Sequence, residues 1–188
     1  MSVPPATVGP TRGPLLSRIG AALALRPDFY AAAAADRTAT GPAGAIVCVV
    51  AMLRESVVVY EISQVFASWG LILPILAVVA LLGWLLIGAV AWIVTRPAAT
   101  SATSYRALLR CLGFAQTPTM LFATLAAATD STLYLILYAA LTAWAFAAIV
   151  VALRAATATT TGRATVLAVP VFLAQFAVLV VSRVLVLG

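Results

Sequence analysis

Residues 105–118 read YRALLRCLGFAQTP, and they mark the point where a charged segment passes into an apolar one. Arg106 and Arg110 are four residues apart, a spacing that places both on one face of a helix. From Leu112 onward the chain is apolar, and four further apolar runs lie on either side of this stretch. We expect a short basic helix at the cytoplasmic membrane surface, with membrane-spanning helices arranged around it.

The composition of the chain is that of an integral membrane protein. Of 188 residues, 64% are hydrophobic and 9% are charged, whereas a soluble domain carries about 25% charged residues. All eleven basic residues are arginine, and the chain contains neither lysine nor histidine. The arginines lie singly or in small groups between apolar runs, a pattern that indicates membrane topology and argues against nucleic-acid binding.

The distribution of helix breakers and apolar runs predicts three regions. Residues 1–14 hold four prolines and two glycines, so we expect a disordered tail. Residues 15–40 form a cytoplasmic amphipathic segment, with one helix from Leu15 to Arg26 and an alanine-rich helix from Phe29 to Asp36. The first helix either lies on the membrane surface or packs on the bundle, and these placements are compatible. Residues 41–188 form the transmembrane domain.

The third region predicts five transmembrane helices, since about 20 apolar residues are needed to cross the hydrocarbon core. The predicted spans are Ala45–Phe66, Leu71–Val94, Leu112–Ala128, Leu133–Leu153 and Ala164–Val181. Pro118 is expected to kink the third span, because a proline removes the N–H that would bond to the carbonyl four residues earlier. The predicted fold class is therefore an all-α membrane protein of five transmembrane helices, preceded by a short amphipathic helix.

The arginines also predict how the spans are oriented. Four arginines precede the first span, three lie between the second and third spans, and two lie between the fourth and fifth. The connections around residues 63–70 and around Asp130 hold none. Because arginine accumulates in cytoplasmic loops, we expect the N-terminus in the cytoplasm and the C-terminus on the outer side.

Ionisable residues inside the spans form a first candidate site. Arg54 and Glu55 lie near the middle of the first span, Glu61 follows two turns later, and Arg183 lies near the end of the fifth. A charged side chain at the bilayer centre costs about 3 kcal/mol on insertion scales, so such residues face the bundle interior and find partners there. These four residues are a candidate intramembrane charge site.

The pair Arg106 and Arg110 forms a second candidate site. Two arginines on one helical face just outside the bilayer are able to hold lipid phosphates or an acidic partner. The simpler alternative is that they only fix the orientation of the neighbouring spans.

No set of residues predicts catalysis, a cofactor or a metal site. The chain has no histidine, and its five carboxylates do not cluster in the sequence, so neither a general base nor a set of metal ligands is evident. Cys48 and Cys111 have neither CxxC spacing nor a nearby histidine, and we expect two inert thiols.

One short motif follows the pattern leucine-arginine-x-leucine-glycine-aromatic, with a proline four residues later. Its residues are Leu109, Arg110, Gly113, Phe114 and Pro118. Together with a cytoplasmic N-terminal segment and five spans, this motif resembles the Yip family, the Rab-associated multi-pass membrane proteins and their bacterial relatives. The resemblance covers about residues 15–185.

The resemblance implies a five-span membrane fold and a structural role for the motif residues. Eukaryotic members resemble membrane adaptors that bind prenylated Rab GTPases through a longer cytoplasmic N-terminal region, whereas this chain has about 40 residues there. Its bias toward alanine and arginine, with no lysine, is similar to that of proteins from GC-rich bacterial genomes. We therefore expect a bacterial-type member in the cytoplasmic (inner) membrane.

Three functions fit the sequence. The favoured one is a non-enzymatic scaffold or accessory subunit that binds another integral membrane protein or a second copy of itself. The second is a small transporter or permeation protein that uses the charged residues of the first span. The third is an organiser of lipids or membrane shape that acts through the N-terminal helix, Arg106 and Arg110.

Small residues in the spans bear on the first of these functions. Such residues allow close helix contact, either within the chain or against a partner. They include Gly83, Gly88, Ala139, Ala140 and Ala143.

Overall fold

The computed structural model describes the backbone of residues 14–63, 69–97, 103–127 and 131–187. Within these ranges, side chains are described outside residues 55–63, 69–73, 126–127 and 182–187. The tail predicted for residues 1–14 therefore lies almost wholly outside the described residues.

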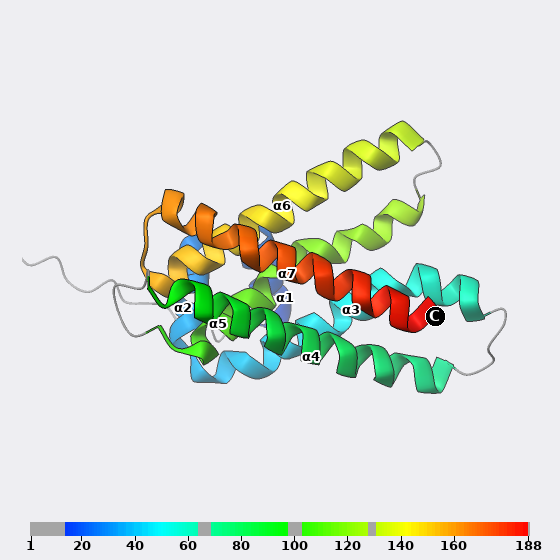
Figure 1. Ribbon diagram of the computed structural model, residues 1–188, viewed down its shortest axis with the longest axis horizontal. Coiled ribbons are helices and arrows are strands. Elements are labelled where there is room, and N and C mark those ends of the chain that lie inside the picture. The colour runs from blue at the N-terminus through cyan, green and yellow to red at the C-terminus, as the bar shows by residue number, and fades with distance from the viewer. Residues whose placement is uncertain (1–13, 64–68, 98–102, 128–130, 188) are drawn as a thin grey trace, which may run out of the picture.

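The described residues form helices and no strands. The helices are α1 (Leu15–Leu23), α2 (Pro27–Ala35), the 3₁₀-helix η1 (Arg37–Ala39), α3 (Thr40–Ser63), α4 (Trp69–Thr95), α5 (Tyr105–Ala115), the 3₁₀-helix η2 (Thr117–Ala127), α6 (Ser131–Thr157) and α7 (Thr161–Leu187). The long helices run roughly along the long axis of the molecule, and α2 and α5 lie at one end of it (Figure 1).

Three helices in the described part of the chain are long and apolar enough to cross a membrane. They are Pro74–Thr95 of α4, Ser131–Thr157 of α6 and Thr161–Val181 of α7, with mean hydropathies of 2.5, 2.3 and 2.4. These helices lie where the second, fourth and fifth spans were expected. Residues 45–63 of the first predicted span lie in α3, which has 24 residues, and residues 64–66 lie outside the described residues.

The prediction of a single kinked helix for the third span is wrong. α5 ends at Ala115, and the chain continues as η2. Pro118 has no N–H to offer the Phe114 carbonyl, and the Thr117 hydroxyl donates to that carbonyl instead, at 2.6 Å. The Thr119 hydroxyl donates to the Gln116 carbonyl, also at 2.6 Å. These hydroxyls stabilise the break, because they supply hydrogen bonds to carbonyls at the point where the helix pattern is interrupted.

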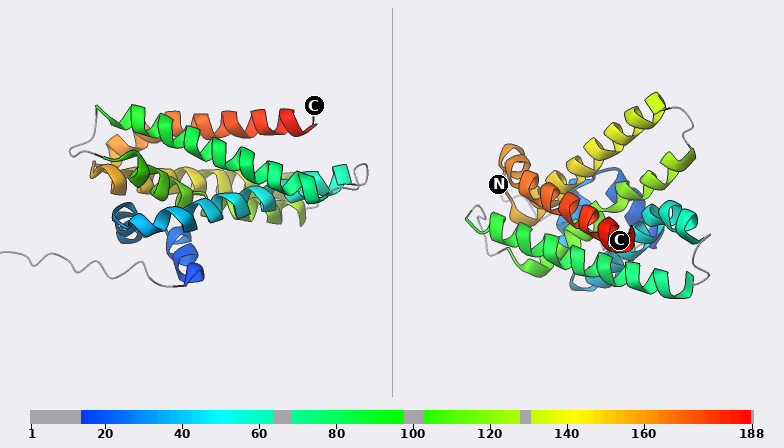
Figure 2. Two further views of the ribbon diagram at one scale, coloured as in Figure 1. Left: turned by 90° about the horizontal axis from the view of Figure 1, so that it is seen from below. Right: turned by 45° about the vertical axis from the view of Figure 1, so that its right-hand side comes forward.

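α5 lies at the centre of the helix arrangement. It contacts α2, α3, α4 and α6, and every residue from Leu108 to Ala115 is buried. One hydrophobic core joins the N-terminal helices to the long ones, since Tyr30 of α2 belongs to the same buried cluster as Leu153 of α6. α1 and α7 lie on opposite sides of this core (Figure 2, left). The packing is therefore continuous across residue 40, where the sequence suggested a boundary.

The two N-terminal helices differ from their predicted limits. α1 ends at Leu23, because Leu25 has a φ of 52°, the left-handed conformation that terminates helices. α2 begins at Pro27, whose fixed φ suits the first helical position. The Trp144 indole of α6 donates to the Leu23 carbonyl at 3.1 Å, so α1 packs on the bundle. Its Leu16 is 80% exposed, and contact with the membrane surface stays a prediction.

The contact between α5 and α3 at Gly113 leads to a testable prediction. A Cβ on Gly113 would lie 2.7 Å from the Ala43 Cβ and 3.1 Å from its carbonyl oxygen, and neither atom belongs to a flexible side chain. We expect Gly113→Ala to lower the free energy of unfolding by about 1–3 kcal/mol, because the two helices must separate. Thermal unfolding in detergent measures the change.

Gly20→Ala is the matched control for this substitution. A Cβ on Gly20 would meet no heavy atom within 4 Å, and alanine in the interior of α1 adds helix propensity. We expect Gly20→Ala to unfold at or above the wild-type temperature. A Gly113→Ala variant that is as stable as the wild type would contradict the close contact.

Candidate functional site

The first group of contacts around the motif residues attaches α5 to α2. The Arg110 guanidinium donates to the Ala34 carbonyl in the last turn of α2, and Arg110 is only 5% exposed. A cation beside the C-terminus of a helix is favoured, because the unpaired carbonyls there carry partial negative charge. The Phe114 ring packs edge-on against Phe29, with 5.0 Å between the ring centroids. α2 is thus held by one charged and one aromatic contact.

A second pair of contacts extends this attachment to α1. The Cys111 thiol donates to the Tyr30 carbonyl at 3.4 Å, and the Tyr30 hydroxyl donates to the Ala22 carbonyl at 3.3 Å. Burial raises the pKa of the Tyr30 hydroxyl above its ordinary value, and the neighbouring Cys111 thiol adds to the rise. The hydroxyl therefore keeps its proton and donates to α1.

α4 approaches the other side of α5 at a glycine. The Leu109 side chain lies against Gly88, where a Cβ would collide with it. The Trp84 indole N–H donates to the Leu109 carbonyl at 3.0 Å. The motif residues are therefore internal contacts of the bundle. All five are buried: Leu109, Arg110, Gly113, Phe114 and Pro118.

The structure separates the predicted pair Arg106 and Arg110. Arg106 is exposed, whereas the Arg110 guanidinium is buried against α2. The spacing does place the two residues on one helical face, but α2 covers only the second of them. A contact with lipid phosphates or an acidic partner stays a prediction for Arg106. The Arg110 side chain is buried and is not exposed to lipid or to a partner in this structure.

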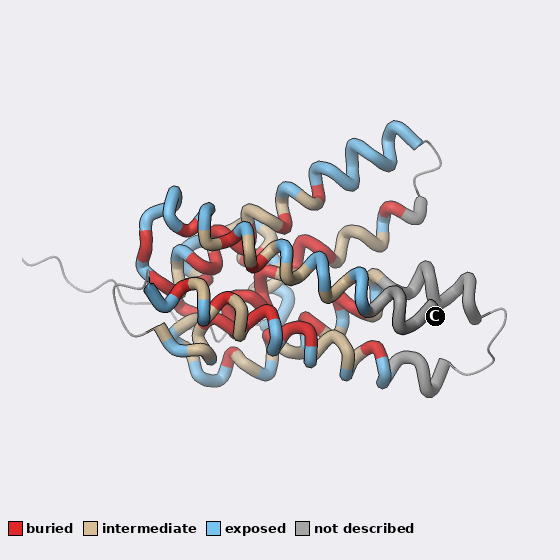
Figure 3. Tube along the Cα trace, viewed as in Figure 1, coloured by how far each residue is buried: buried red, intermediate tan, exposed pale blue. Residues whose placement is uncertain are grey.

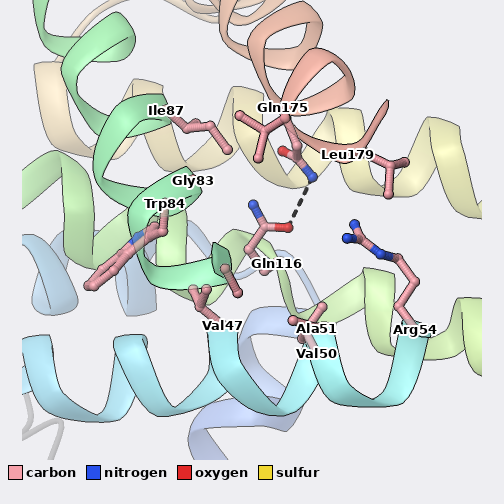
Figure 4. Close-up of a pocket in the computed structure, with 12 residues that line it drawn as sticks. Val47, Val50, Ala51, Arg54, Gly83, Trp84, Ile87, Gln116, Gln175 and Leu179 are labelled. Atoms are coloured by element: carbon pink, nitrogen blue, oxygen red, sulfur yellow. Dashed lines mark hydrogen bonds between the residues drawn. The ribbon is translucent and has the colours of Figure 1, made fainter. Parts of the chain in front are cut away.

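A polar cavity lies between α3, α4, α7 and the junction of α5 with η2 (Figure 4). Arg54 reaches it from α3 and is half-buried. Gln116 reaches it from the junction and Gln175 from α7, and the Gln175 amide N–H donates to the Gln116 amide oxygen at 3.0 Å. The remaining wall is mainly apolar, with Trp84 and Ile87 of α4 on one side. Three polar side chains from three elements therefore converge in one cavity.

The other members of the predicted charge site lie outside the residues whose side chains the structure describes. They are Glu55, Glu61 and Arg183. Of the predicted set, Arg54 alone is placed, and it faces the polar cavity. Among the described residues, no group of three or more histidines, cysteines, aspartates or glutamates is positioned to hold a metal ion.

Sequence reasoning did not single out Gln116 or Gln175 as site residues. The chain has three glutamines and no asparagine, and Gln175 interrupts the apolar run VFLAQFAVL. A polar side chain inside an apolar span faces the bundle interior, so this position carried a usable signal. Gln116 carried less, because it directly precedes the Thr-Pro break and reads as an ordinary turn residue.

The different surroundings of the two arginines lead to a second prediction. Arg110→Met removes a charged donor from a buried carbonyl, so we expect a loss of about 1.5–3 kcal/mol in the free energy of unfolding. We also expect faster amide hydrogen exchange in residues 29–35, because α2 loses its charged contact. Arg106→Met is the matched control, and we expect it to change neither quantity. Equal effects of the two substitutions would contradict the placement of Arg110.

Comparison with known proteins supports the membrane assignment. The family model of the Yip1 domain matches residues 17–182, which is most of the chain and includes the whole motif. A search among curated proteins and another among solved structures give no match. The matched region contains all three helices that are long and apolar enough to cross a membrane. The chain is an integral membrane protein that belongs to the Yip1 domain family.

Proposed function

We propose that this protein is a non-enzymatic membrane scaffold or accessory subunit, which binds a helix of another integral membrane protein through the first half of α6. The observation that carries the proposal is that every residue from Ser131 to Ala140 is exposed (Figure 3). α4 has buried residues from Leu76 to Thr95 and α7 has them from Ala164 to Val171, whereas this half of α6 has none. It also diverges from α3, α4 and α7 (Figure 1).

The residues on this half of α6 suit a helical partner. Ala139 and Ala143 are both exposed and four residues apart, a small-xxx-small spacing that lets a second helix approach closely. The glycines of α4 are not available in this way, because Gly83 faces Val178 of α7 and Gly88 faces Leu109 of α5. The small residues of the spans thus divide into an internal set and an external set, and the external set favours a partner.

Filling the external face tests the proposal. We expect the double variant Ala139→Leu with Ala143→Leu to lose its co-purifying membrane partner when native membranes are extracted in mild detergent. Overpacking a tight contact with added methylenes costs about 1–3 kcal/mol, so the dissociation constant for the partner should rise roughly tenfold or more. Quantitative mass spectrometry measures the partner, and thermal unfolding shows whether the fold is intact.

Ala177→Leu is the matched control, since Ala177 is an exposed alanine on α7. We expect this variant to retain the partner at the wild-type level. Retention of the partner by the α6 double variant, or an equal loss in the control, would contradict the proposal. If the retained species is a second copy of the chain, the scaffold is a homo-oligomer.

We propose further that the chain crosses the cytoplasmic membrane of a bacterium five times, with its N-terminus in the cytoplasm. α3 has 24 residues, and at about 1.5 Å a residue a helix of this length exceeds a hydrocarbon core of about 30 Å. The end of α4, the end of α6 and the start of α7 lie at the same end of the molecule as α2 and α5 (Figure 1). The exposed Arg96, Arg154 and Arg163 lie at these helix ends, as the positive-inside rule requires of a cytoplasmic side.

Reporter fusions test this topology. We expect alkaline phosphatase fused after Gly188 to be active, because the C-terminus reaches the outer side, and a green fluorescent protein at the same position to be dark. The reverse pattern would contradict five crossings. A phosphatase fused within residues 158–160, between α6 and α7, is the control and should be inactive.

The two alternative functions each rest on a narrower observation. Arg106 and the exposed Leu16 support contact with lipid. The polar cavity supports permeation, but its volume is only about 50 Å³, whereas sites for drug-sized ligands measure about 300–1,000 Å³. The scaffold proposal uses the larger exposed surface.

A further inference from the structure

The polar side chains of the cavity do not satisfy all of one another's hydrogen-bond donors and acceptors. In the described part of the chain, the Gln175 amide oxygen is buried and has no hydrogen-bond partner. Its amide nitrogen donates to the Gln116 amide oxygen, which leaves the Gln116 amide nitrogen as a donor beside an unused acceptor. A buried polar atom without a partner destabilises the fold, so the cavity favours an occupant that supplies the missing bonds.

The chemistry of these atoms restricts the occupant. The Gln175 oxygen needs a donor, whereas the Gln116 amide nitrogen needs an acceptor. The Arg54 guanidinium reaches the same cavity and is a donor only. A metal cation cannot donate a hydrogen bond to the Gln175 oxygen or accept one from Gln116, and a halide ion cannot donate one. Water does both, and a space of about 50 Å³ accommodates a few water molecules, since each needs about 10–15 Å³ on this measure.

The order of the lining residues along their helices shows how the cavity runs through the bundle. At the end near α5, the Trp84 indole is bonded to the Leu109 carbonyl. On α3 and α7 the lining residues farthest from this end are Arg54 and Leu179 (Figure 4). Arg54 is half-buried there. The polar cavity therefore extends from Trp84, near α5, to Arg54 and Leu179.

We propose that the polar cavity is a hydration site, in which ordered water bridges the Gln175 amide oxygen to the Gln116 amide nitrogen. The inference is independent of any protein partner and so goes beyond the scaffold proposal. It also accounts for a guanidinium in the middle of α3, because water in the bundle lowers the cost of placing a charge there. The same water satisfies amide groups at the break between α5 and η2, where irregular backbone is tolerated beside a polar cavity.

X-ray hydroxyl-radical footprinting of the full-length protein in lipid nanodiscs tests this site. Radicals form from water where it is bound and oxidise the adjacent side chains, and mass spectrometry locates the products. We expect oxidation of Leu179 of the cavity at a rate several-fold above that of Leu82. Leu82 is 61% exposed on the outer face of α4, where lipid excludes water. Equal rates at the two leucines would overturn the proposal.

A variant without the two glutamine amides is the second test of the hydration site. We expect Gln116→Leu with Gln175→Leu to lower the oxidation rate of Trp84 several-fold, because the cavity becomes dry. Trp92, which does not line the cavity, is the internal control and should keep its rate. An unchanged rate at Trp84 in a folded double variant would overturn the proposal. If the variant does not fold, the comparison of Leu179 with Leu82 in the wild-type protein still decides.

Discussion

The approach of Gly113 to Ala43 is the constraint on which the rest of the structure depends. It brings the backbone of α5 against the first turn of α3 without an intervening side chain. α5 has 11 residues and acts as one rigid unit, so its other contacts are fixed once this one is made. Arg110 then reaches α2, and Leu109 reaches α4. A wider separation at Gly113 would move all of these contacts together.

The parts of the fold that depend on local pattern were predictable from sequence. The apolar lengths of α4, α6 and α7 predict spanning helices, because length and hydropathy are properties of each segment alone. The break at Pro118 was placed correctly but interpreted as a kink. A proline determines which hydrogen bond is lost, whereas the Thr117 hydroxyl and the surrounding packing determine whether the helix recovers.

The candidate site was less accessible to sequence reasoning, because it is formed by residues far apart in the chain. The spacing of Arg106 and Arg110 specifies a shared face of α5, but it does not say that α2 covers part of that face. Arg54 was recognisable as a charge inside a predicted span. Its association with Gln116 and Gln175 required the positions of three helices. The described charges and polar groups thus became a site only through tertiary packing.

The 3₁₀ geometry of η2 limits the distance that this segment covers. η2 has 11 residues and rises about 22 Å at about 2.0 Å a residue. α4, α6 and α7 have 27 residues each, or about 40 Å at 1.5 Å a residue. A hydrocarbon core is about 30 Å thick, so α4, α6 and α7 are each long enough to cross it, whereas η2 alone is not. A crossing that uses η2 therefore has to include residues on either side of it.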